Sequence, residues 1–369
     1  MRICIFYNGT DSSFEKDVNL EFSSNRNRFM AGEIISRLAH TVDCNESHVL
    51  QVNGVSDDSR FLGTALGVGL EQNVQFGKNF WVHRMSQSVD ADNELIICGW
   101  SRGGITAMCL ARAVSDYLND KQVAINSWKI KVMAFDPVAG KGANWEGQRQ
   151  WYQLDPRVTE YVGFYARHET TQGFETTIPS RASFDTKMTL IDVAAFHSSL
   201  VGSVTETPPK IPGMLTDYDR TAARVYRIVQ MRAIKTLNDK DEWCIPFDKS
   251  RLKAWKDKIN GLPAAIGLNS TEEISELRDR CRTHAIAFDK VRTTDYSGRG
   301  VFVGNNLLSR KWDKDIDIWR FLDQDNSFFT KGRILSQIAT EAFINRGSSV
   351  GNFSCEMIDG GTETSQILT

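Results

Sequence analysis

The 369-residue chain lacks long hydrophobic runs and any marked excess of charge. No apolar stretch reaches the roughly 18 residues that a membrane-spanning helix needs. The 44 basic and 46 acidic residues give a net charge of −2, so no overall field attracts nucleic acid or an anionic membrane. The opening MRICIFYNGT holds too short an apolar segment for a secretory signal peptide. The sequence therefore predicts synthesis in the cytoplasm without a cleaved leader, and no nucleic-acid partner.

The chain also lacks paired cysteines. Its seven cysteines are scattered and odd in number, and none forms a C-x-x-C pair. A zinc site or a disulfide framework is therefore not expected, and a reducing compartment of synthesis is favoured. No internal repeat and no low-complexity tract interrupts the chain, and 41% apolar with 24% charged residues is typical of an ordinary globular protein.

What is present is an alternation of short apolar strands with helix-like segments over the first two hundred residues. Helical spacing of apolar residues predicts a helix over 105–120. Strands are predicted at 2–8, 94–100, 128–136, 160–168 and 188–197. This pattern predicts an α/β fold, with a mainly parallel sheet of the α/β-hydrolase type and helices on both faces.

The composition of the chain changes near residue 205, where the proline-rich segment TETPPKIPG is typical of a linker. We therefore expect a catalytic core over 1–205, and over 206–369 a mainly helical cap or accessory region that could also complete the core. Beyond the linker, helices are predicted at 219–237, 249–259, 270–288 (with a capping box from Ser270 to Glu273) and 331–344, a strand at 298–308, and a polar C-terminal stretch from 351 with a loose end.

One motif carries chemistry. Gly99-Trp100-Ser101-Arg102-Gly103 matches G-x-S-x-G, with a predicted strand before it and a predicted helix after it. In that context the serine lies on a strained turn with its hydroxyl above the carboxyl edge of the sheet. The alternative is a tight strand-to-helix turn with no catalytic role, because short motifs recur by accident.

A nucleophilic serine needs a base and an orienting carboxylate. Asp136 and His197 each end a predicted strand, so both should lie at the same sheet edge as Ser101. Asp136 could instead be a turn residue and His197 a buried structural histidine. His168 competes as base, but only one candidate strand separates it from Asp136, and the adjacent Glu169 suggests a local ion pair.

The oxyanion that forms during ester cleavage needs two N–H donors. One is expected from Arg102, the residue after the serine, and the second from Gly9 or Thr10 in the loop after the first strand. A plain Asn-Gly turn at Asn8-Gly9 is the structural alternative.

Five segments together resemble a known family: FYNGTDSS, GWSRGGITAMCLAR, AFDPVAG, FYARHETTQGFETTIP and AFHSSLVGS. Their order and spacing are similar to those of the α/β-hydrolase domain family DUF2235, which includes the Tle1-like phospholipase effectors of bacterial type VI secretion. The resemblance covers roughly residues 1–205. It implies Ser101 as nucleophile, Asp136 as orienting acid and His197 as base, and it makes His168 structural.

The chain also departs from the family pattern. Asn8 stands where the family has aspartate, Pro137 and Ala139 alter the aspartate loop, and Ser199 replaces an acid after the histidine. These departures keep the three catalytic residue types but leave the substrate open.

The leading interpretation is a serine hydrolase of carboxylic esters, a lipase or phospholipase without cofactor or metal. Residues 262–268 are one candidate for its lid, with a buried turn as the equal alternative. The resemblance further implies a lipid substrate, contact with a membrane surface, delivery by type VI machinery into a target cell and a cognate immunity protein. Two alternatives remain: an esterase for small or carbohydrate-linked acyl groups, and an inactive hydrolase-fold interaction module.

Overall fold

The computed structural model spans the whole chain, and the structure describes the larger part of its first 265 residues and three short strands beyond them. The described residues are 1–10, 33–45, 47–54, 69–87, 93–139, 153–166, 176–181, 185–193, 195, 197–202, 214–239, 243–265, 301–303, 306–308 and 353–358.

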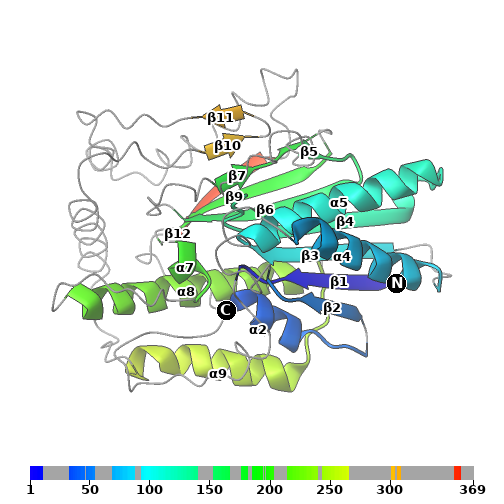
Figure 1. Ribbon diagram of the computed structural model, residues 1–369. Coiled ribbons are helices and arrows are strands. Elements are labelled where there is room, and N and C mark those ends of the chain that lie inside the picture. The colour runs from blue at the N-terminus through cyan, green and yellow to red at the C-terminus, as the bar shows by residue number, and fades with distance from the viewer. Residues whose placement is uncertain are drawn as a thin grey trace.

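A seven-stranded sheet forms the centre of the molecule (Figure 1). Its strand order is β12-β9-β6-β4-β3-β1-β2, and every neighbouring pair is parallel. The strands are β1 (Arg2–Tyr7), β2 (His48–Val52), β3 (Asn93–Trp100), β4 (Trp128–Phe135), β6 (Val158–Ala166), β9 (Lys187–Val193) and β12 (Phe353–Ile358). Because all strands run the same way, their carboxyl ends form one edge of the sheet, where sites of α/β proteins are built.

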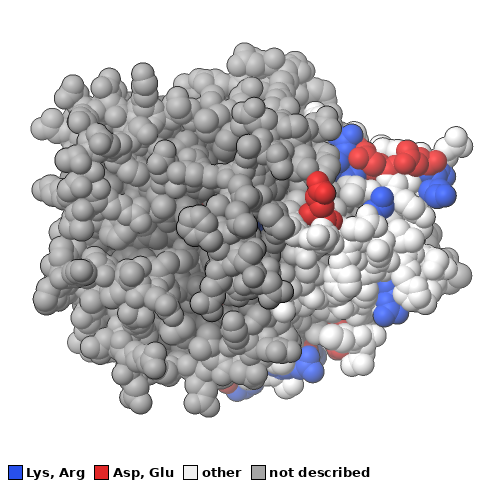
Figure 2. All heavy atoms as spheres, in the orientation of Figure 1, with Lys and Arg blue, Asp and Glu red and all other residues white. Residues whose placement is uncertain are grey.

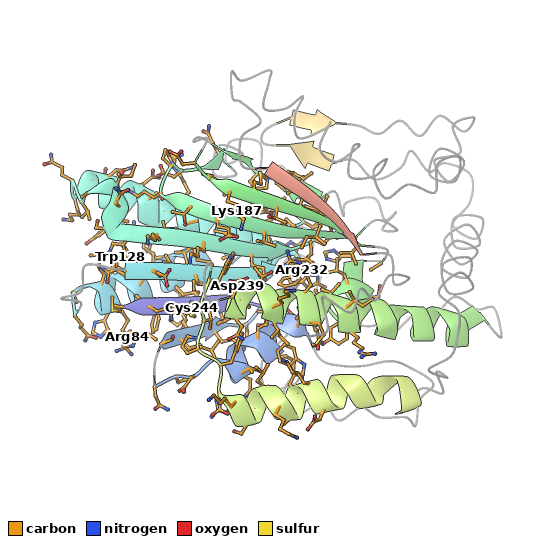
Figure 3. The ribbon with its side chains drawn as sticks, turned by 180° about the vertical axis from the view of Figure 1, so that it is seen from behind. Arg84, Trp128, Lys187, Arg232, Asp239 and Cys244 are labelled. Carbon is orange, nitrogen blue, oxygen red and sulfur yellow. The ribbon has the colours of Figure 1, made fainter. Side chains whose placement is uncertain are left out.

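Helices cover both faces of this sheet. α4 (Leu70–Met85) and α5 (Arg102–Asp120) lie over one face. The opposite face is covered by α2 (Ile34–Thr41), α8 (Met214–Asn238) and α9 (Lys249–Ala265). Figure 3, which views the molecule from behind, shows α8, which carries Arg232, in front of the sheet on this second face.

The strand sequences explain the two layers. Side chains alternate between the faces of a strand, and in β1 Ile3 and Ile5 join the core beneath α4 and α5, whereas Cys4 and Phe6 join the core beneath α2 and α8. Both sets are apolar because both faces are covered, as expected for a parallel sheet.

The remaining elements are short. β7 (Thr176–Ile178), β10 (Val301–Val303) and β11 (Asn306–Leu308) form a three-stranded sheet, and β5 (Gln153–Leu154) pairs with β8 (Ser180–Arg181). A 3₁₀ turn, η2 (Ile125–Ser127), precedes β4, and one helical turn, α7 (His197–Leu200), follows β9.

The predicted fold class is confirmed: the sheet is parallel and covered by helices on both faces, as in α/β hydrolases. The predicted strands correspond to β1, β3, β4, β6 and β9, and the helices predicted at 105–120, 219–237 and 249–259 correspond to α5, α8 and α9. Three differences stand out. α2, β2 and α4 were not predicted, the strand predicted to end on His197 ends at Val193, and the C-terminal stretch contains β12.

Several sequence expectations concern segments outside the described residues. These are the proline-rich linker, the helices at 270–288 and 331–344, and His168. The division at residue 205 stays a prediction, but elements on both sides of it contribute to one sheet and its layers, since β12 pairs with β9 and α8 packs on the second face.

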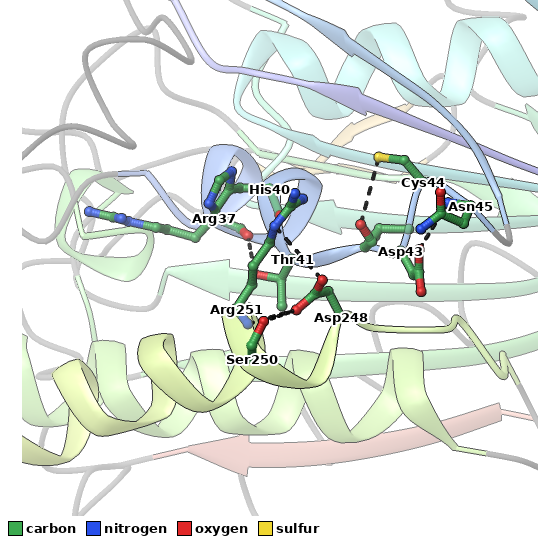
Figure 4. Close-up of polar contacts among 10 residues, drawn as sticks. Arg37, His40, Thr41, Asp43, Cys44, Asn45, Asp248, Ser250 and Arg251 are labelled. Carbon is green, nitrogen blue, oxygen red and sulfur yellow. Dashed lines mark hydrogen bonds and ion pairs between the residues drawn. The ribbon is translucent and has the colours of Figure 1, made fainter.

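Polar contacts join α2 to the start of α9 (Figure 4). The Arg251 guanidinium donates to the carbonyl of His40, 3.1 Å away. The Asp248 carboxylate accepts the N–H of Arg251 at 2.9 Å, which caps the first turn of α9. The bond from Arg251 to His40 joins α9 to α2.

The face shown in Figure 2 carries scattered charges of both signs over its described part. Within the described ranges, no helix is both long and apolar enough to cross a bilayer.

Candidate active site

Ser101 lies on a sharp turn between β3 and α5. β3 ends at Trp100, α5 begins at Arg102, and Ser101 between them has φ 56° and ψ −122°. A non-glycine residue at positive φ is strained, and such strain is typical of a nucleophile held on an elbow.

Two glycines allow this turn. A Cβ on Gly99 would lie 2.1 Å from the carbonyl oxygen of Gly103, and a Cβ on Gly103 would lie 2.3 Å from the carbonyl oxygen of Tyr7. Strand, helix and β1 therefore approach one another more closely than any side chain would permit, which is the physical reason for glycine at both ends of the motif.

Backbone hydrogen bonds hold the turn in place. The N–H of Ser101 donates to the carbonyl of Phe135 at 2.9 Å, and the carbonyl of Ser101 accepts from Gly104 at 3.0 Å and from Val138 at 3.2 Å. The serine is thus fixed both to its own helix and to the loop that carries Asp136.

Ser101, His197 and Asp136 form a hydrogen-bonded row. Ser101 Oγ lies 2.8 Å from His197 Nε2, and His197 Nδ1 lies 2.6 Å from Asp136 Oδ2. An ionised carboxylate only accepts, so Nδ1 carries the proton and donates to Asp136. Nε2 is then the acceptor for the Ser101 hydroxyl, which is the arrangement of a serine nucleophile with its base.

Asp136 is fixed from three sides and is fully buried. Its Oδ1 accepts the N–H of Ala166 at 3.1 Å, its Oδ2 faces His197, and its own N–H donates to Phe164. Its backbone has φ 40°, a second positive-φ residue in the same site. The carboxylate therefore has one orientation, directed at the imidazole.

His197 reaches the site from α7 rather than from a strand end. β9 stops at Val193, and His197 is the first residue of the helical turn that follows. The prediction of a strand through His197 was wrong because the apolar run AAF continues past the last strand residue. The expectation that the histidine lies beside Ser101 does not depend on that detail, since the loop after β9 starts at the same sheet edge.

The first loop contains the predicted oxyanion donors. The N–H of Gly9 donates to Glu33 Oε1 at 3.1 Å, and Glu33 is buried. The Arg102 guanidinium donates to Thr10 Oγ1 at 3.2 Å, which ties the loop to the elbow. The N–H of Thr10 donates to no acceptor in the described part of the chain. Of the two predicted N–H groups, that of Thr10 is therefore the better placed to bind a substrate oxygen.

Arg102 is the first residue of α5, where N–H groups lie outside the hydrogen-bond ladder of the helix. The positive end of the helix dipole adds to the attraction for a negative oxygen at this point.

Two contributors were missed from the sequence. Glu33 belongs to no motif, and only the fold brings it under Gly9. Trp100 belongs to G-x-S-x-G, and its place directly before the serine could have indicated a role in the site. The centroid of its ring lies 5.3 Å from that of His197.

Burial also affects other titratable side chains of β3, α5 and β6. Burial raises the pKa of the Cys98 thiol well above its ordinary value, and burial likewise raises the pKa of Cys109. For Tyr161, burial is the largest cause of a raised pKa, and the charge of Asp136 adds to it. Within the described residues, no group of His, Cys, Asp and Glu side chains is suited to hold a metal ion.

No protein-family model and no curated protein matches the chain. Solved structures with a similar fold include the Tle1 effector bound to the VgrG spike of the type VI secretion system, with a TM-score of 0.34 and 16% identity over 56% of this chain and 52% of that one. An uncharacterised protein from Pseudomonas aeruginosa has a TM-score of 0.39 and 12% identity over 81% of this chain and 64% of its own. A protein of Lactobacillus plantarum named as a cell surface hydrolase has a TM-score of 0.35 and 8% identity over 70% of this chain and 98% of its own.

The chain spans about half the length of the Tle1 effector that it matches. All three likenesses have TM-scores below 0.5 and do not indicate a substrate or a partner of this chain.

Proposed function

We propose that the chain is a serine hydrolase that cleaves carboxylic esters, with Ser101 as nucleophile, His197 as base and Asp136 as orienting acid. The observation that carries the proposal is the continuous row from Ser101 Oγ through the imidazole to a buried carboxylate. Each residue alone has a structural interpretation, but a strained serine, a buried histidine and a buried aspartate in this order have no comparable one.

The first half of the reaction transfers the acyl group to the enzyme. His197 Nε2 takes the proton from Ser101 Oγ as that oxygen attacks the ester carbonyl carbon. The N–H groups of Arg102 and Thr10 stabilise the negative oxygen of the tetrahedral intermediate. The imidazolium then gives its proton to the leaving alcohol oxygen, and the acyl-enzyme remains.

The second half releases the acid. His197 removes a proton from water, the hydroxide oxygen attacks the acyl carbon, and the proton returns to Ser101 Oγ. Asp136 stays ionised throughout and stabilises the imidazolium in both halves. No metal or cofactor takes part in this sequence of steps.

We extend the proposal to lipid esters, as in a lipase or phospholipase, on the basis of the motif resemblance. Delivery by type VI machinery, contact with a membrane surface and an immunity protein belong to the same extension. Small or carbohydrate-linked esters are the alternative substrate class and use the same site.

The test is hydrolysis of p-nitrophenyl esters of increasing acyl length by the wild type and by Ser101→Ala, with phospholipid vesicles as a second substrate. We expect turnover to fall by about a thousandfold or more in the variant. Long-chain preference together with vesicle lysis supports the lipase class, and short-chain preference without lysis supports the small-ester class. Equal activity in both proteins, or no labelling of wild-type Ser101 by a fluorophosphonate, would favour an inactive hydrolase-fold module.

A further inference from the structure

Trp100 contacts both the first loop and the imidazole of His197. A Cβ built on Gly9 would lie only 2.1 Å from the six-membered ring of Trp100, so the Gly9 backbone is directly against it. The ring centroids of Trp100 and His197 are 5.3 Å apart and their planes are inclined by 33°. The indole is thus a fixed wall that presents its face to the histidine.

The indole N–H takes no part in this arrangement. It is buried, and among the residues that the structure describes it has no hydrogen-bond acceptor. Buried tryptophans normally find a partner for this group, because leaving it unsatisfied costs free energy. The contact with His197 through the ring face is therefore the interaction that distinguishes tryptophan from a smaller apolar residue at this position.

We infer that Trp100 is a positioning residue for His197, holding the imidazole in line with Ser101 and stabilising its positive charge. The inference rests on the proposed function, because it assigns a role within the same reaction.

The reaction makes His197 positive twice, once in each half. The face of an aromatic ring attracts a cation within about 6 Å of its centroid, with tryptophan the most effective ring. The imidazolium then has two stabilising neighbours: the Asp136 carboxylate at Nδ1 and the indole over its ring. The indole also occupies space in which water could compete for the imidazole hydrogen bonds.

The effect belongs to the transition state rather than to substrate binding. As the general base, the imidazole takes up its proton only as the serine attacks. Loss of the indole face should therefore lower kcat and leave KM nearly unchanged.

Trp100→Phe and Trp100→Leu separate the aromatic face from the volume of the side chain. Both variants lack the indole N–H and part of the side-chain volume, but only phenylalanine keeps a ring. We expect kcat to follow the order Trp, Phe, Leu, with a loss of about three- to thirtyfold in Trp100→Leu and KM within about twofold. If Trp100→Leu does not fold, Trp100→Met replaces it, because its unbranched side chain adapts to irregular space.

Trp81→Leu is the matched control for the loss of a buried indole. Trp81 is fully buried and packs edge-on against Tyr117 and Trp128, away from the catalytic row. We expect this variant to lose thermal stability and to keep the kcat of the wild type, per folded molecule.

A second measurement reports directly on the imidazole of His197. The proton between His197 Nδ1 and Asp136 should give a downfield ¹H NMR resonance in the wild type, which Trp100→Phe retains and which exchanges faster with water in Trp100→Leu. Equal kcat in the Phe and Leu variants, with the resonance unchanged in both, would overturn the inference while leaving the proposed function intact. Absence of both esterase activity and fluorophosphonate labelling in the wild type would overturn the proposed function, and with it this role.

Discussion

At the scale of single residues, the candidate site depends on two backbones held in uncommon conformations. Ser101 and Asp136 both have positive φ, and both are fixed by backbone hydrogen bonds from the neighbouring strand or loop. Local strain of this kind persists only where the surroundings determine it. The packing of β3, β4 and α5 therefore sets the direction of the two side chains that flank His197.

Asp136→Asn tests the orienting role with little change in shape. The amide oxygen can still accept the N–H of Ala166, but the amide nitrogen then faces His197 Nδ1 and favours the wrong imidazole tautomer. We expect kcat to fall by about 10³- to 10⁴-fold, while the melting temperature changes by only a few degrees, as circular dichroism would record. Retention of more than a tenth of wild-type kcat would contradict the role of Asp136.

At the scale of elements, the strand ends opposite the site are joined by a charged cluster. Glu94 of β3 accepts from the Arg2 guanidinium of β1 at 2.8 Å and from Lys131 Nζ of β4 at 2.9 Å. Burial alone would raise the pKa of Glu94, but the bonds from Lys131 and Arg2 outweigh it and hold that pKa below its ordinary value of 4.5. The cluster thus links three adjacent strands at their starts.

Glu94→Gln should destabilise the sheet, because Lys131 is buried and loses its carboxylate. We expect a loss of about 1–3 kcal/mol in unfolding by urea at pH 7, since the cluster is partly exposed. Because the folded pKa is lowered, the contribution of Glu94 is fully present above its ordinary pKa. It is lost as the pH falls through the folded value, so wild type and variant should converge on acidification below about pH 4.5.

Asp116→Asn is the control for this prediction, since Asp116 pairs with Arg112 on the exposed surface of α5. This substitution should lower the free energy of unfolding by about 0.5 kcal/mol or less. A difference between wild type and Glu94→Gln that is constant from pH 7 to pH 3 would show that the carboxylate charge is not the cause.

The elements that the sequence predicted are those with a strong local signal. β1, β3 and β4 carry apolar residues on both faces, and α5 follows a glycine-flanked serine. The spacing of apolar residues and the G-x-S-x-G motif therefore predict the same elements. α4 was missed because only Leu70, Val74, Gly77 and Trp81 of LEQNVQFGKNFWVHRM are buried, and further apolar residues such as Phe76 lie off that face and obscure its helical spacing. β12 was missed because a short strand in a polar, glycine-bearing stretch is stabilised by pairing with β9 rather than by its own sequence.

The residues of the candidate site were likewise predictable only where the sequence has a strong local signal. Ser101, Asp136 and His197 follow or end predicted strands, and a parallel sheet brings such positions to one edge. Glu33 and Trp100 were not predicted as site residues, because their contacts with Gly9 and His197 depend on the paths of loops and helices far apart in the chain.

At the scale of the whole molecule, the two regions expected from the sequence share one core. α8 covers the second face of the sheet, and from Tyr226 to Leu237 most of its side chains are buried. The apolar ones larger than alanine are Tyr226, Ile228, Val229, Met231, Ile234 and Leu237. All of them except Met231 belong to the same cluster as Cys4 and Phe6 of β1. The segment after residue 205 therefore supplies part of the hydrophobic core that the first segment needs.

A chain that ends at residue 205 should consequently fail to fold. Burying one large apolar side chain contributes about 1.5–3 kcal/mol, so loss of the α8 layer removes on the order of 10 kcal/mol, comparable with the whole stability of a typical domain. We expect the 1–205 fragment to be insoluble or to lack a cooperative thermal transition, and to show no labelling of Ser101 by a fluorophosphonate that labels the full chain. Of the described elements, a chain that ends at residue 352 loses only the edge strand β12, and it should keep a cooperative transition at a lower temperature. A soluble, cooperatively melting 1–205 fragment would show instead that the first segment is an independent domain and that α8 only covers it.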